Sequence, residues 1–156
     1  MLMYAENARK INATLAAINP DATEDIIELG RMDSMLQARD RLDQGYLVGM
    51  LADRGLGDDV TVDCEFLGEM APFPVGPWRM AAMLRRPVFF MTGLYLGGNR
   101  YRVHLEPLAD FSATPRADVA AAIGEAQRRY VGRLAHYCRL APYNWFNFFD
   151  FWRKDR

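Results

Sequence analysis

Apolar residues recur at the spacing of an α-helix in two segments near the start of the chain. The first predicts a helix over about Glu6–Ile18, which the turn Asn19-Pro20-Asp21 ends because proline cannot continue a helix. The second predicts a helix over about Ser34–Asp43, and Gly45 follows it as a stop signal.

Two more helices are predicted farther along the chain. One begins at Pro77 and extends to about Arg85. The other begins at Thr114-Pro115, because threonine is a favourable N-cap and proline is favoured at the first helical position, and Pro142 ends it. The expected apolar face of this long helix carries Val119, Ile123, Ala126, Tyr130, Leu134 and Cys138.

Strands are predicted from two other patterns. Tyr46–Ala52 is a continuous apolar run between turn residues, which is typical of a parallel strand buried on both faces. Val60–Phe66 alternates between polar and apolar side chains and indicates a more exposed strand. The remaining predicted strands are Asp25–Leu29, Pro87–Leu96 and Arg100–Leu105, the last two joined by the hairpin turn Gly97-Gly98-Asn99.

The succession of helices and strands predicts an α/β protein with a layered mixed sheet flanked by helices, and with residues 1–156 in a single domain. Its composition, 51% hydrophobic and 25% charged, is that of a globular protein. The formal net charge of −1 excludes the broad basic field that recruits nucleic acid.

Cysteine usage and hydropathy indicate the cellular setting. Cys64 and Cys138 lie far apart without a C-x-x-C partner, which argues for reduced thiols in the cytoplasm and against a metal site. No segment approaches the roughly 20 apolar residues of a membrane-spanning helix, and the N-terminus lacks the order of a signal peptide. Any membrane contact is therefore expected to be peripheral, at the inner face of the cytoplasmic membrane.

Asp53 and Arg54 directly follow the predicted strand Tyr46–Ala52. In α/β sheets, ligands gather beyond the carboxyl ends of the strands, so this position makes both residues candidates for substrate binding. The alternative is a salt bridge that only rigidifies the end of the strand.

A second candidate is Phe73-Pro-Val-Gly76, just before the helix that begins at Pro77. The free N–H groups of a first helical turn form an anion site, which Arg79 would reinforce. Gly76 would let the backbone approach a phosphate, a carboxylate or a thioester oxygen. The alternative is a tight turn into the helix without a ligand.

In their order along the chain, these segments resemble the second half of the lysophospholipid acyltransferase superfamily, nearest its lipid A biosynthesis branch. The resemblance implies part of a glycerolipid-acyltransferase-like domain, which transfers an acyl group from a thioester to the hydroxyl of a lipid-like acceptor. The co-substrate would be an acyl thioester of acyl carrier protein or coenzyme A, with no bound cofactor. The matching segments are Leu51-Ala-Asp-Arg-Gly55, Phe66-Leu-Gly68, Phe73-Pro-Val-Gly76 and Arg86-Pro87-Val88. The implied substrate-binding residues are Asp53, Arg54, Phe73, Pro74, Gly76 and Arg79.

The superfamily's catalytic pair, a histidine followed five positions later by Asp or Glu, is missing. Ala109 stands at that spacing from His104, and Ala141 from His136, so no catalytic residue is predicted. In the superfamily this histidine acts as general base on the acceptor hydroxyl. A truncated chain, a first half supplied by a second polypeptide and a non-catalytic remnant all remain open. The rival function is a lipid-binding or interaction module without chemistry.

The C-terminal segment 144–156 is unusually rich in aromatic residues. If Asn144–Trp152 is helical, one stripe carries Trp145, Phe148, Phe149 and Trp152. Such a stripe either docks on the core with a large aromatic area or anchors the chain at a membrane surface.

Overall fold

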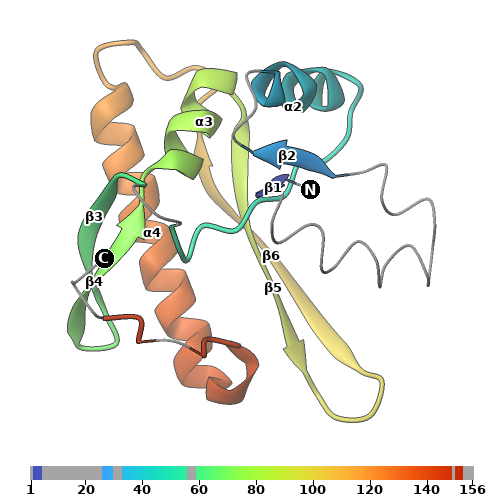
Figure 1. The fold of residues 1–156 in the computed structure, drawn as a ribbon, viewed down its shortest axis with the longest axis vertical. Coiled ribbons are helices and arrows are strands. Elements are labelled where there is room, and N and C mark those ends of the chain that lie inside the picture. Colours follow the sequence, from blue (N-terminus) through green and yellow to red (C-terminus); the bar gives the residue numbers. More distant parts are fainter. Residues whose placement is uncertain (1, 5–25, 30–32, 56–58, 149, 153–156) are drawn as a thin grey trace. The chain divides into compact units, whose positions relative to one another are not determined.

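The computed structural model describes residues 2–4, 26–29, 33–55, 59–148 and 150–152 (Figure 1). The chain divides into two compact units, Met1–Ala52 and Asp53–Arg156. The prediction that residues 1–156 form one domain stays a prediction.

The first unit is built around a short parallel strand pair. Strand β1 (Leu2–Tyr4) pairs with β2 (Ile27–Leu29), and helix α2 (Ser34–Asp43) contacts β2. Strand β2 and helix α2 confirm two predicted elements. The helix predicted over Glu6–Ile18 lies outside the described residues.

The prediction of a buried parallel strand at Tyr46–Ala52 is wrong. Among the described residues, this run makes one isolated bridge, between Met50 and Leu2, and Gly49 accepts a hydrogen bond from the Leu2 amide at 2.8 Å. Leu47 is 88% exposed and Leu51 is 63% exposed. Among the described residues only Leu2 bridges to this run, so most of its apolar side chains have no strand beside them to pack against.

The second unit contains two antiparallel hairpins and two helices. The α/β class is confirmed, although the described strands form three two-stranded sheets, so the single layered mixed sheet stays a prediction. The elements are β3 (Thr61–Phe66), β4 (Glu69–Pro74), α3 (Gly76–Leu84), β5 (Pro87–Tyr95), β6 (Tyr101–Asp110), α4 (Val119–Leu140) and the 3-10 turn η2 (Pro142–Asn144).

Helix α4 begins at Val119, so the predicted start at Thr114-Pro115 is wrong. The Thr114 hydroxyl donates instead to the Asp110 carbonyl oxygen at 3.2 Å, which holds Thr114 in the turn after β6. Asp118 takes the N-cap position, and its carbonyl oxygen accepts from the Ala122 amide at 2.9 Å.

Both hairpins contact α4 (Figure 1). The side of β3–β4 that faces α4 belongs to a core cluster in which Phe66 and Phe73 are fully buried, with ring centroids 5.4 Å apart. On β5–β6, Phe90 is buried and stacks on Tyr137 of α4 at 5.6 Å. The long helix is therefore the common support of the two hairpins.

The predicted helix over Asn144–Trp152 is also wrong for the described residues. After η2 the backbone is extended at Trp145, with φ −99° and ψ 97°. Two indole hydrogen bonds explain this path, because Trp145 Nε1 donates to Asp53 Oδ2 at 3.3 Å and Trp152 Nε1 donates to the Phe66 carbonyl oxygen at 3.2 Å. These bonds hold both indoles against the core cluster.

Candidate functional site

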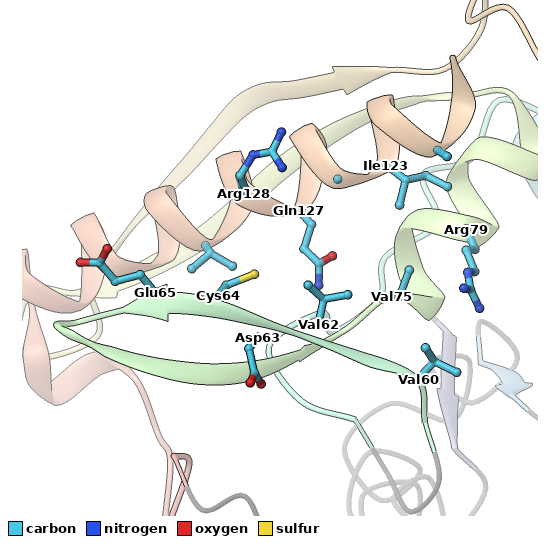
Figure 2. Close-up of a pocket in the computed structure, with 13 residues that line it drawn as sticks. Val60, Val62, Asp63, Cys64, Glu65, Val75, Arg79, Ile123, Gln127 and Arg128 are labelled. Carbon is cyan, nitrogen blue, oxygen red and sulfur yellow. The ribbon is translucent and has the colours of Figure 1, made fainter. Parts of the chain in front are cut away.

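A groove of about 640 Å³ lies between β3 and α4 and reaches the start of α3 (Figure 2). This volume is in the range of small-molecule sites, which are mostly apolar with a few polar groups. The groove combines these features. Its lining residues are Val60, Val62, Asp63, Cys64, Glu65, Val75, Arg79, Ala120, Ile123, Gly124, Gln127, Arg128 and Val131.

The sequence periods of the two elements produce the apolar walls. On β3, alternation directs Val62 and Cys64 toward α4, whereas Asp63 points away (Figure 2). On α4, the lining residues recur at three- and four-residue steps from Ala120 to Val131, which places them along one helical face. Sequence analysis predicted both elements but had no means of finding the groove between them.

Gln127 fixes the turn at one end of the groove. Its side chain is 3% exposed, and Nε2 donates to the carbonyl oxygens of Phe73 at 3.0 Å and Pro74 at 3.4 Å. These bonds tie the end of β4 to α4. Sequence analysis missed this residue, although a glutamine beside the apolar positions of a helix is the available signal.

The start of α3 supplies the polar end of the groove. Val75, the N-cap residue, offers no side-chain hydrogen bond, and the first turn contains no acidic residue. Arg79 is exposed and lies at this end of the groove (Figure 2). An uncapped helix N-terminus beside a guanidinium favours an anion or a polarised carbonyl oxygen.

Gly76 is exposed at the first position of α3. A Cβ atom built on it meets nothing within 4 Å, so the protein itself does not require glycine here. The open space at Gly76 leaves room for a ligand beside the helix N-terminus. Phe73, by contrast, is fully buried in the core cluster, and Pro74 presents its carbonyl oxygen to Gln127.

Asp53 and Arg54 form a second polar place, outside the residues that line the groove. Asp53 is 8% exposed, and its Oδ2 atom accepts from Arg54 Nη2 at 3.2 Å as well as from Trp145. Its Oδ1 atom is buried and has no hydrogen-bond partner among the described residues. The ion pair fits the structural alternative considered for these residues, in which a salt bridge rigidifies this part of the chain.

The two cysteine thiols are poor nucleophiles for physical reasons. Burial raises the pKa of the Cys64 thiol, and the Arg128 guanidinium opposes part of this effect. Burial and the charge of Asp53 raise the pKa of the Cys138 thiol to about 11. Neither cysteine is therefore poised for covalent catalysis.

Neither histidine has an Asp or Glu five positions later, and both histidine rings contact Tyr137 instead. The ring of His104 on β6 lies 4.9 Å from the Tyr137 ring, and His136 on α4 lies 5.1 Å from the same ring. Glu106 is bound elsewhere, because its carboxylate pairs with Arg133 at 2.6 Å and accepts from the Tyr137 hydroxyl at 2.5 Å.

The aromatic segment is divided between the core and the surface. Trp145 and Trp152 pack on the core cluster, whose member Phe151 is 4% exposed although it lay outside the predicted stripe. Phe148 is 89% exposed, and Phe149 lies outside the described residues. The two indoles are therefore docked on the core, whereas Phe148 is exposed to solvent.

Within the described ranges, no group of three or more His, Cys, Asp or Glu side chains is arranged to hold a metal ion. None of the helices in that part of the chain is long and apolar enough to span a bilayer.

The fold and the groove define an α/β protein with a largely apolar groove that ends at an arginine and a helix N-terminus. The sequence matches the bacterial lipid A biosynthesis acyltransferase family over residues 22–154, and the chain therefore belongs to this family. Comparisons with curated proteins and with solved structures gave no match.

Proposed function

We propose that this chain binds the acyl thioester and the hydroxyl acceptor of an O-acyl transfer reaction. The observation that carries the proposal is the family match over residues 22–154, supported by a groove with apolar walls and a cationic end. The alkyl chain lies between β3 and α4. The thioester oxygen or a phosphate of its carrier lies at Arg79 and the start of α3.

In the proposed reaction the acceptor hydroxyl is the nucleophile and the thioester is the acyl donor. A base removes the proton of the acceptor hydroxyl, the oxygen attacks the thioester carbonyl, and the carrier leaves as a thiol. Donors at the start of α3 stabilise the negative charge that develops on the carbonyl oxygen. The buried Oδ1 atom of Asp53, which has no hydrogen-bond partner among the described residues, accepts a hydrogen bond from a second hydroxyl group of the acceptor, because the base takes the proton of the attacking hydroxyl.

The general base is the part that this sequence does not contain, because neither histidine has Asp or Glu at the fifth following position. We therefore expect binding without turnover from the 156-residue chain. The carrier is acyl carrier protein or coenzyme A, the acceptor is lipid-like, and the reaction takes place in the cytoplasm at the inner face of the membrane. The alternative function is a binding module that never takes part in acyl transfer.

Calorimetric titration with a long-chain S-alkyl coenzyme A thioether, which cannot be hydrolysed, tests the binding step. Arg79→Ala should weaken the affinity about tenfold, which corresponds to about 1.4 kcal/mol. Arg100→Ala, which removes the same charge at the β5–β6 turn, is the matched control and should leave it unchanged. Equal affinities of the two variants, or no binding by the wild type, would refute the proposed site.

A turnover assay separates the two functions. The purified chain is incubated with an acyl thioester and hydroxyl-bearing lipid acceptors, and the released thiol is measured. We expect no release above background. Turnover that Arg54→Ala abolishes would instead exclude the binding-module alternative and overturn the expectation that this chain lacks a base.

A further inference from the structure

One side of the β5–β6 hairpin carries only apolar, aromatic or glycine residues over the four cross-strand pairs that follow one another from the turn, and it ends at Pro87, which pairs with the charged Asp110. We call these four pairs the outer face. Strand pairing places its residues in four opposite pairs, so they form one continuous surface. These pairs are Phe89 with Pro107, Met91 with Leu105, Gly93 with Val103, and Tyr95 with Tyr101. Their large side chains are strongly exposed: Phe89 48%, Met91 70%, Tyr95 49%, Tyr101 68%, Val103 66% and Leu105 58%.

The opposite side of the hairpin fixes this orientation. Phe90, Leu94 and Leu108 point the other way and are buried, with 4%, 7% and 2% of their surface exposed. Glu106 on that side pairs with Arg133 of α4. The outer face cannot turn inward without breaking these contacts, because neighbouring residues of a strand point to opposite sides.

The size of the outer face exceeds that of an ordinary surface patch. Six large side chains with half to two-thirds of their surface exposed amount to roughly 600–700 Å², at 150–250 Å² for each aromatic residue. The largest apolar patch of a typical monomer covers about 300–600 Å². A standard protein interface takes about 800 Å² from each partner, so the outer face supplies most of one.

We propose that the outer face is the interface of a symmetric dimer, in which a second copy of this chain packs face to face on it. A twofold interface brings identical surfaces together, so a charge near the axis would meet its own copy. The eight positions of the outer face contain no charged residue. Gly93 lies between Phe89 and Tyr95 on this face without a side chain, and a Cβ built there meets nothing within 4 Å, which leaves room for a side chain of the second copy.

A lipid bilayer is a less favourable partner for the outer face than a second copy of the chain. In the described part of the chain, β5 and β6 pair with no further strand, and side chains bond single backbone groups of each, as Asn144 does at the Tyr95 amide and Arg129 at the Leu108 carbonyl oxygen. The strand edges therefore have no continuous backbone partner. Burying such edges in hydrocarbon costs several kcal/mol for each unsatisfied group. A protein layer about 10 Å away, as in stacked sheets, covers the face and leaves the edges in water.

Sedimentation velocity of the full chain over a range of concentrations tests this proposal. The expected species has twice the 17.8 kDa mass of the chain. Met91→Glu should weaken the dimer at least tenfold. The matched control is Met83→Glu on α3, because Met83 is 72% exposed and Met91 is 70% exposed. The Met83→Glu variant should form the same dimer as the wild type.

A charge-complementation experiment excludes a simple folding defect. Met91→Glu and Met91→Lys chains should each be monomeric with the wild-type circular dichroism spectrum, and mixing them should restore a dimer. A monomeric wild type, or an unaffected Met91→Glu dimer, would overturn the proposal. A monomeric wild type that sediments with lipid vesicles, with this property lost in Met91→Glu, would assign the face to a bilayer instead.

Discussion

The two hairpins of the second unit have the same topology but different surroundings. Both are antiparallel strand pairs that place one side on α4. On β3 the residues between the inward positions include Asp63 and Glu65, which are exposed and charged. On β5–β6 the corresponding positions form the uncharged outer face. The two hairpins therefore differ in the side that faces away from the core. Charged residues on β3 suit contact with water, whereas the uncharged outer face of β5–β6 suits contact with a protein partner.

The largest effect expected from this comparison concerns the inner side of β3–β4. Phe66→Ala should destabilise the protein by about 3–5 kcal/mol, because it leaves a cavity in the core cluster. Phe89→Ala, on the outer face, should change the free energy of unfolding by only about 0.5 kcal/mol when the chain is monomeric. Urea unfolding at low protein concentration measures both values. Similar losses for the two variants would remove the distinction between the hairpins.

A smaller effect concerns how the hairpins are held on α4. Hydrogen bonds from Arg133 and Tyr137 lower the pKa of the Glu106 carboxyl group below its ordinary value. Because the folded-state pKa is lower than the unfolded one, this contribution is complete above about pH 4.3, the ordinary value for Glu, and is lost as the pH falls through the lowered pKa. The β3–β4 hairpin, by contrast, contacts α4 through the aromatic and apolar side chains of the core cluster.

Urea midpoints measured from pH 7 to pH 3 test this difference. The wild type should lose part of its stability in the acidic range, and Glu106→Gln should show a shallower decrease because it removes the titrating group. Hydrogen exchange should locate the acid-induced loosening in β5–β6. Identical pH profiles for the two proteins would show that the ion pair does not hold the hairpin.

Local patterns predicted the elements whose partners are close in sequence. Helix α2, strand β3 and the β5–β6 hairpin follow from periodicity and turn residues within each segment. Strand β4 was missed because Pro72 and Pro74 argue against a strand, yet an edge strand paired on one side tolerates proline. The strand predicted over Tyr46–Ala52 was wrong because an apolar run does not specify a pairing partner, and among the described residues only Leu2 bridges to it.

The candidate site was predicted less completely than the fold. Position in the sequence pointed to Arg79 and the start of α3, which lie at the groove. It did not point to Cys64, Gln127 or the α4 wall, because these meet only through tertiary packing. The C-terminal stripe illustrates the same limit, since two indole hydrogen bonds to distant residues replaced the helix that its periodicity predicted.

The alkylation rate of Cys64 tests the central claim, that the groove between β3 and α4 holds the alkyl chain of a thioester. Cys64 lines the groove, and because burial raises its pKa the reaction with iodoacetamide is followed at mildly alkaline pH by peptide mass spectrometry. A long-chain S-alkyl coenzyme A thioether at ten times its Kd should slow the modification about tenfold, whereas coenzyme A without the chain should not. An unchanged rate at saturating thioether would contradict the account.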